Sequence, residues 1–182
     1  MSFFANSSDH MSPAVLLQLL ASVLEPKSCA YVAGPLESGR TYYELGASGN
    51  QRPGLRLENE KRLSDFALRL RQRLAYPVFN SGLLRVPNWK GRDYGAFFLD
   101  VIRNYARECW FLDGWEYSTG ATKEFVFCCT IRVPCFAESG ERLTVADGLD
   151  LMRKAAEYVQ GLQLDNTKLR SRVDDLTRFM SA

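Results

Sequence analysis

An α/β fold with a small, doubly wound parallel sheet is predicted by three features of the sequence. Short apolar runs alternate along the chain with longer amphipathic segments. No hairpin turn joins one apolar run to the next, which favours parallel strands covered by helices on both faces. The length of 182 residues, with 46% hydrophobic and 24% charged residues, suits one domain with a full-sized core. These features are typical of flavodoxin-like and Rossmann-like sheets.

The expected strands are the short apolar runs at residues 28–33, 76–80, 109–112 and 133–136. Expected helices span residues 14–24, 55–74, 95–106 and 119–131, and a last helix begins after Thr144. Ser12 and Pro13 suit the N-cap and first turn of the first helix, and Thr144 with Asp147 forms the pattern of a capping box. The polar segment 36–53 is too long for a simple connection, so it is expected to be a binding loop or a disordered one.

Composition narrows the possible functions. A net charge of +2 is too small to indicate sequence-specific nucleic-acid binding. No apolar run approaches the roughly 20 residues that a membrane span requires. Residues 1–11, expected to be a flexible tail, lack the order of a secretory signal. We therefore expect a cytoplasmic protein that has no membrane partner.

The cysteines and the single histidine limit the chemistry of any site. Five cysteines, an odd number with no C-x-x-C pair, favour buried reduced thiols. The only histidine, His10, lies in the expected tail. We therefore expect no metal site and no cofactor, and we expect the acid, base or nucleophile of a folded site to be a carboxylate.

The last helix has a pattern that is typical of a coiled coil. Its apolar positions recur at alternating steps of three and four residues, with Leu at the d positions: Val159, Leu162, Asn166, Leu169, Val173, Leu176 and Met180. β-Branched or polar a positions with Leu at d favour a parallel dimer, and a single Asn at a sets the register. We expect an α/β domain over residues 12–160 and a coiled-coil helix over residues 161–182 that makes a homodimer. The alternative is an amphipathic helix that folds back on its own domain.

The segment from Trp110 to Glu124 contains the strongest indication of function. It is expected to form a buried strand, a tight turn and then a helix that carries Glu124 in its second turn. Ligands of α/β proteins bind at the carboxyl edge of the sheet. Glu124 is therefore expected beside a cleft.

Several local patterns together resemble the nucleoside 2-deoxyribosyltransferase-like superfamily. The resemblance covers roughly residues 30–136 and is greatest to small, functionally uncharacterised members that carry a GWE-x-S-x-GA-x-x-E segment. The matching residues are Tyr31-Val32-Ala33-Gly34-Pro35, Val78-Phe79-Asn80, Asp93-Tyr94, Asp100, and Gly114-Trp115-Glu116 with Ser118, Gly120, Ala121 and Glu124.

The resemblance implies cleavage of the N-glycosidic bond of a nucleoside or nucleotide. Glu124 matches the glutamate that attacks the anomeric carbon, and Asp100 matches an aspartate that assists the sugar or the leaving base. This assignment agrees with the chemistry, because a nearby carboxylate stabilises an oxocarbenium-like transition state. The expected substrate-binding residues are Gly34, Pro35, Arg40, Tyr42, Asn80, Asp113, Trp115, Ser118, Gly120 and Ala121.

Two departures from the superfamily pattern change the expected substrate. Ser118 stands where the characterised transferases usually have an acid, and Ala121 stands where they have threonine. With Ser118 as N-cap, the N–H groups of Gly120 and Ala121 suit a phosphate, which favours a nucleotide over a nucleoside. Arg40 is the expected cationic partner of that phosphate.

Structural interpretations of these residues remain open beside the functional ones. They are an ion-paired surface role for Glu124, a helix-surface ion pair with Arg103 for Asp100, core packing for Trp115 and a loop anchor for Asn80. Three classes of function follow: an N-glycosidic hydrolase or transferase, a nucleotide-binding or sensing module without turnover, and a dimeric interaction scaffold.

Overall fold

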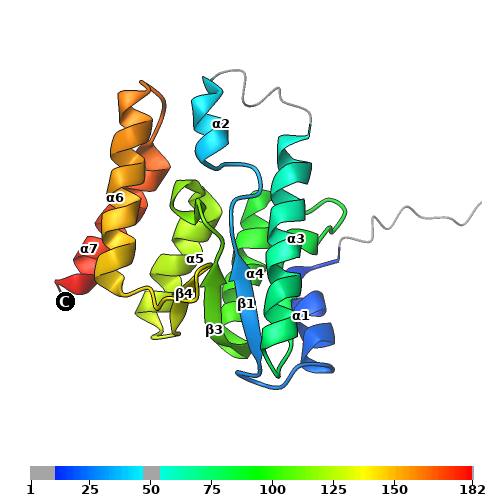
Figure 1. The fold of residues 1–182 in the computed structure, drawn as a ribbon. Coiled ribbons are helices and arrows are strands. Elements are labelled where there is room, and N and C mark those ends of the chain that lie inside the picture. Colours follow the sequence, from blue (N-terminus) through cyan, green and yellow to red (C-terminus); the bar gives the residue numbers. More distant parts are fainter. Residues whose placement is uncertain (1–10, 47–53, 182) are drawn as a thin grey trace, which may run out of the picture.

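The computed structural model describes residues 11–46 and 54–181. Its centre is a four-stranded, all-parallel sheet with the order β2-β1-β3-β4. The strands are β1 (Cys29–Ala33), β2 (Val78–Asn80), β3 (Ala106–Phe111) and β4 (Cys135–Ala137). Helices lie on both faces of the sheet (Figure 1). The predicted doubly wound parallel α/β fold is therefore confirmed.

The helices follow the predicted order with small changes in their bounds. They are α1 (Pro13–Ala21), α2 (Arg40–Glu44), α3 (Leu55–Arg73), α4 (Gly91–Tyr105), α5 (Thr119–Thr130), α6 (Val145–Gly161) and α7 (Thr167–Met180), with 3-10 turns η2 (Ser81–Leu83) and η3 (Trp115–Tyr117). Helix α4 begins four residues earlier than expected, because the Lys90 N–H donates to the Asp93 carboxylate at 2.8 Å and starts the helix there. No helix of the described residues has the length and apolar character that crossing a membrane requires.

Each strand contributes alternate side chains to two separate cores. Ala30 and Val32 of β1 face α3, where they pack with Leu63, Phe66 and Leu70. Tyr31 and Ala33 face the opposite side, where they pack with residues of α4 and α5. Because α3 covers one face and α4 and α5 cover the other, the loops after β1, β2 and β3 meet at the carboxyl edge of the sheet.

The segment after β1 contains a short helix that the sequence did not predict. Helix α2 occupies Arg40–Glu44 inside the expected loop, and Tyr43 anchors it in a small core together with Tyr117 and Val159. Residues 47–53 of that loop and residues 1–10 of the expected tail lie outside the described residues. The part of the segment that follows β1 directly is therefore ordered structure.

A C-terminal helix is present, but it is not a continuation of the preceding helix as the coiled-coil pattern predicted. Helix α6 ends at Gly161, Gln163 adopts a left-handed conformation with φ of 58°, and a new helix, α7, starts at Thr167. Asn166, expected at an a position, instead donates from its side chain to the Ala156 carbonyl at 2.9 Å. Leu169 and Leu176 are 2% and 0% exposed.

Helix α7 packs against α5 and α6 of its own domain, so the structure shows the folded-back alternative (Figure 1). Leu176 belongs to the core beneath α4 and α5, and Leu169 belongs to the core beneath α6. Leucines that are buried in their own domain cannot form the seam of a parallel dimer. These leucines therefore give no support to a homodimer through this helix, and Thr167–Met180 pack on the α/β domain.

Candidate functional site

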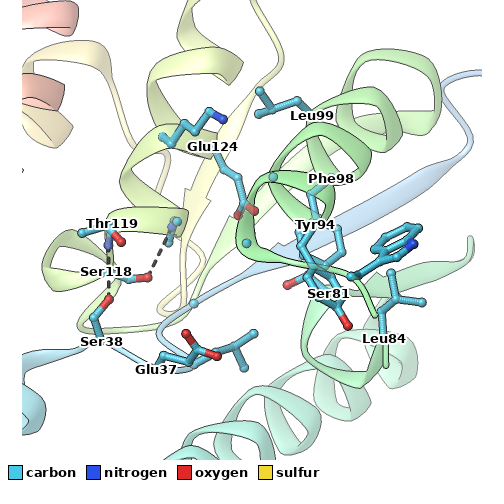
Figure 2. A pocket seen from close by; sticks show the side chains of 18 of the residues that line it. Glu37, Ser38, Ser81, Leu84, Tyr94, Phe98, Leu99, Ser118, Thr119 and Glu124 are labelled. Atoms are coloured by element: carbon cyan, nitrogen blue, oxygen red, sulfur yellow. Dashed lines mark hydrogen bonds between the residues drawn. The ribbon is translucent and has the colours of Figure 1, made fainter. Parts of the chain in front are cut away.

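A cavity of about 450 Å³ lies at the carboxyl edge of the sheet (Figure 2). The segments that line it follow β1, β2 and η3, and they include parts of α4 and the first two turns of α5. Gly34 is required at its inner wall, because a Cβ atom there would lie 2.8 Å from Leu63 Cδ1 and 3.0 Å from Leu112 Cβ. The strand ends and one helix start therefore form a single concave site.

Glu124 is the most buried carboxyl group of this cavity. It lies in the second turn of α5, is 8% exposed, and accepts a hydrogen bond of 3.0 Å from the hydroxyl of Tyr31. Burial raises the pKa of Glu124 from 4.5 to about 8, while the Tyr31 hydrogen bond and the charge of Lys123 act in the lowering direction. The group is thus mostly a neutral acid at pH 7, and its ionised form is accessible just above that pH.

Tyr31 is held rigidly on β1 and orients Glu124. Its side chain is fully buried, and its ring stacks on Phe79 at 5.6 Å between centroids. Burial and the neighbouring Glu124 raise the pKa of Tyr31 well above its ordinary value, so the phenol remains a hydrogen-bond donor. A buried carboxyl fixed by a phenol beside a cavity is typical of functional sites.

The start of α5 forms a polar end of the cavity. Ser118 caps the helix by accepting a hydrogen bond from Ala121 N at 3.4 Å, and Thr119 N donates to Ser38 Oγ at 3.4 Å (Figure 2). Ser118, Gly120 and Ala121 all line the cavity, as do the cationic side chains of Arg56, Arg85 and Lys123. The positive end of the helix and these cations suit an anionic group.

Aromatic residues that the sequence analysis did not select line the other end of the cavity. Trp89, Tyr94 and Phe98 lie there, with ring centroids 5.1 Å apart between Trp89 and Tyr94 and 6.1 Å apart between Tyr94 and Phe98. The Tyr94 hydroxyl accepts from Val86 N at 3.0 Å, which ties α4 to the loop after η2. Trp89 in a polar loop and Tyr94 in the matched Asp93-Tyr94 pair were the available signals in the sequence.

Asp100 does not accompany Glu124, which corrects the expected pairing. Its Oδ1 accepts a hydrogen bond of 2.6 Å from Arg103 Nη1, its side chain is 40% exposed, and it lines neither described cavity. The helix-surface ion pair is therefore the role that the structure shows. A different carboxyl group, that of Glu37, lines the cavity with Glu124 and forms an ion pair with Arg56.

The other expected binding residues are divided between two places. Gly34, Ser118, Gly120 and Ala121 line the Glu124 cavity. A second cavity of similar volume is lined by Pro35, Arg40, Tyr42, Asp113 and Trp115. The expected substrate-binding set therefore does not form one site.

Arg40 and Trp115 illustrate why the second group is separate. Arg40 Nε pairs with Glu44 at 2.8 Å, and its guanidinium lies over the ring of Tyr158 at 5.1 Å. Trp115 is 2% exposed and packs on Phe125 with ring centroids 4.6 Å apart, so most of its surface belongs to the core. Arg40 is therefore not the cation beside the start of α5.

Asn80 anchors a loop and lines neither cavity. Its Oδ1 accepts from Gly82 N at 2.9 Å and caps η2, and its Nδ2 donates to Ser64 Oγ at 3.3 Å. The loop-anchor interpretation is thus the one that the structure shows.

The cysteines are free thiols that lie mostly inside the core. Cys109 and Cys128 have their Sγ atoms 3.3 Å apart, and burial raises the pKa of both thiols. Within residues 11–46 and 54–181, no group of three or more histidine, cysteine or acidic side chains is arranged to hold a metal ion.

The fold and cavity define a Rossmann-like α/β protein with a buried carboxyl at the carboxyl edge of its sheet. No protein-family model, curated protein or solved structure matches the chain.

Proposed function

We propose that this protein cleaves the N-glycosidic bond of a nucleotide or nucleoside-like metabolite by hydrolysis or transfer, with Glu124 as the nucleophile. The observation that carries the proposal is the buried Glu124 carboxyl, which lines the 450 Å³ cavity and is fixed by Tyr31. The resemblance of the surrounding segment to the nucleoside 2-deoxyribosyltransferase-like superfamily agrees with it.

The electrostatics of Glu124 suit attack at an electron-poor carbon. A carboxylate with a pKa of about 8 has little hydration to lose, so its ionised form is a stronger nucleophile than a solvated one. Positive charge develops on the sugar as the glycosidic bond breaks, and the adjacent carboxylate stabilises that charge. Tyr31 and Lys123 both favour the ionised form that the reaction consumes.

The walls of the cavity support one orientation of a nucleotide. Trp89, Tyr94 and Phe98 offer aromatic surfaces for a base, because stacking of this kind tolerates any base. The start of α5 at the opposite end offers backbone N–H groups for a phosphate. A sugar between these ends lies beside Glu124 (Figure 2).

The direct test is base release from purine and pyrimidine ribonucleotides and deoxyribonucleotides and their nucleosides, followed by chromatography. The wild-type protein should release the base from at least one of them. Glu124→Gln should lower that rate by about two to four orders of magnitude, with an unchanged circular dichroism spectrum. Failure of the wild type to release any base, or an equally active Glu124→Gln, would overturn the proposal.

A nucleotide-binding or sensing module without turnover is the second candidate. Two observations favour it: the expected assistant, Asp100, pairs with Arg103 outside the cavity, and burial keeps Glu124 mostly protonated at pH 7. Calorimetry with the same compounds distinguishes the two functions. Tight binding with the ligand recovered intact after long incubation would select the binding module.

A further inference from the structure

Two carboxyl groups from different elements approach the same cavity. Glu124 projects from α5, and Glu37 projects from the segment that follows β1. Figure 2 shows the two side chains reaching into the cavity from opposite sides. A sugar bound between them would therefore present one ring face to each carboxyl.

The two groups have different environments. Glu124 is 8% exposed and has only the Tyr31 hydroxyl as a hydrogen-bond partner among the described residues. The Glu37 side chain is 76% exposed and accepts a hydrogen bond from Arg56 Nη1, while Arg56 Nε pairs with Glu60 at 2.7 Å. One carboxyl is thus desolvated, whereas the other is a hydrated, ion-paired carboxylate. Two carboxyl groups with such contrasting environments can take different roles in glycosidic cleavage.

The segment that carries Glu37 is tied to the helix that carries Glu124. Ser38, the next residue, accepts a hydrogen bond from Thr119 N at the start of α5. Arg56 holds Glu37 from α3 on the other side. The segment that carries Glu37 is therefore joined both to the start of α5 and to α3.

We propose that Glu37 is the general base that directs the reaction to water, an assignment that rests on the proposed glycosidic cleavage by Glu124. In the first step the carbon–nitrogen bond breaks as the Glu124 carboxylate bonds to the anomeric carbon. The electron pair of the broken bond leaves with the base, and the base takes a proton from solvent.

In the second step a water attacks the anomeric carbon from the face that the base has vacated. Glu37 accepts the proton of that water, and the bond between carbon and Glu124 breaks to restore the carboxylate. The sum is glycoside plus water giving free base plus free sugar. This step needs a carboxylate on the ring face opposite Glu124, and we assign that role to Glu37, which lines the cavity from the segment after β1.

Glu37→Gln separates the two steps in a rapid-quench experiment with the best wild-type substrate of the nucleotide panel. The variant should release one base per protein molecule in a burst, and its later turnover should fall by about two to four orders of magnitude. Its intact mass should increase by that of the glycosyl group. Sodium azide, a small nucleophile that needs no general base, should restore turnover of the variant.

Asp65→Asn is the matched control, because Asp65 is an exposed carboxylate that pairs with Lys61 at 2.6 Å on α3 and lines neither described cavity. It should show wild-type turnover without a burst. Two results would overturn the assignment of Glu37 while leaving that of Glu124 in place. One is a Glu37→Gln variant with turnover within twofold of wild type. The other is slow turnover with no burst, no mass increase and no azide effect. Absence of base release by the wild type would instead overturn the proposed function, and this assignment with it.

Discussion

Tyr31 of β1 donates a 3.0 Å hydrogen bond to Glu124 of α5 across 93 residues of sequence. The bond joins an inner strand of the sheet to a helix whose start and second turn both line the cavity. It also opposes the effect of burial on the pKa of Glu124. The reactivity of this carboxyl is therefore set by a contact that only the folded chain provides.

Removing the Tyr31 hydroxyl should make Glu124 harder to ionise. The hydroxyl lowers the pKa of Glu124, so Tyr31→Phe should raise it above about 8. If Glu124 reacts as the carboxylate, kcat/KM of the wild type should rise with pH toward an apparent pKa of about 8, and this limb should move to higher pH in the variant. A pH–rate profile of each protein measures this rising limb. A rate that instead falls above pH 8 would assign Glu124 as a general acid.

The same burial should make the protein less stable as pH rises. Below the ordinary pKa of 4.5, Glu124 is protonated in both states and adds no pH dependence. Between 4.5 and about 8 the unfolded chain ionises while the folded protein keeps the proton. The free energy of unfolding should then fall by at most about 1.4 kcal/mol per pH unit, and the fall should end above pH 8.

Glu124→Gln should remove this contribution, because glutamine does not ionise and its amide oxygen can still accept from Tyr31. Urea unfolding at pH 5, 6.5 and 8 measures the effect. The variant should gain stability over the wild type steadily as pH rises through that range. Parallel curves for the two proteins would show that Glu124 is already ionised when folded.

Asp100→Asn should have little effect on stability or on base release. The Asp100–Arg103 pair is exposed at one turn of α4, and such pairs contribute roughly 0–1 kcal/mol. Unfolding in urea and base release, measured beside Glu124→Gln, should both stay close to wild type. A loss of activity comparable to that of Glu124→Gln would return Asp100 to the site and contradict its observed orientation.

Helix α7 should be needed for folding. Truncating a buried leucine to alanine typically costs about 2–5 kcal/mol, so Leu176→Ala, at a 0% exposed position, should lower the free energy of unfolding by that amount. Met180→Ala is the control, since Met180 is 51% exposed and should change stability by less than about 0.5 kcal/mol.

Deleting the chain after Leu162 should abolish cooperative unfolding, because it exposes the core that Leu169 and Leu176 cover. Circular dichroism melting tests this expectation. A truncated chain that stays folded but sediments as a monomer, where the full chain sediments as a dimer, would support the coiled coil.

Local patterns were sufficient for most of the fold. The apolar runs predicted all four strands, and the small polar residues Ser12, Ser118 and Thr144 correctly marked three helix starts. These signals depend on residues close together in the chain, so no knowledge of the tertiary structure was needed. The depth of Glu124 in α5 followed from the same reasoning, because the cap at Ser118 sets the helical phase of residues after it.

The C-terminal helices show where that reasoning ends. Apolar steps of three and four residues are shared by a dimer seam and by a helix that packs on its own domain. Only the surface beneath α7 decides between them, and that surface comes from α5 and α6. The turn between α6 and α7 also depends on Asp165. Its carboxylate accepts a hydrogen bond from Thr167 N at 2.9 Å, which favours the start of a new helix there.

The sequence by itself determined the class of fold, the position of Glu124 at the edge of the sheet and the cap that begins its helix. The tertiary structure alone decided which charged groups stand beside it. It brought Glu37, from the segment after β1, to the cavity that Glu124 of α5 lines. The physical reason is that helix phase and strand order follow from local pattern, whereas the partner of a side chain depends on elements distant in sequence that the core packs together.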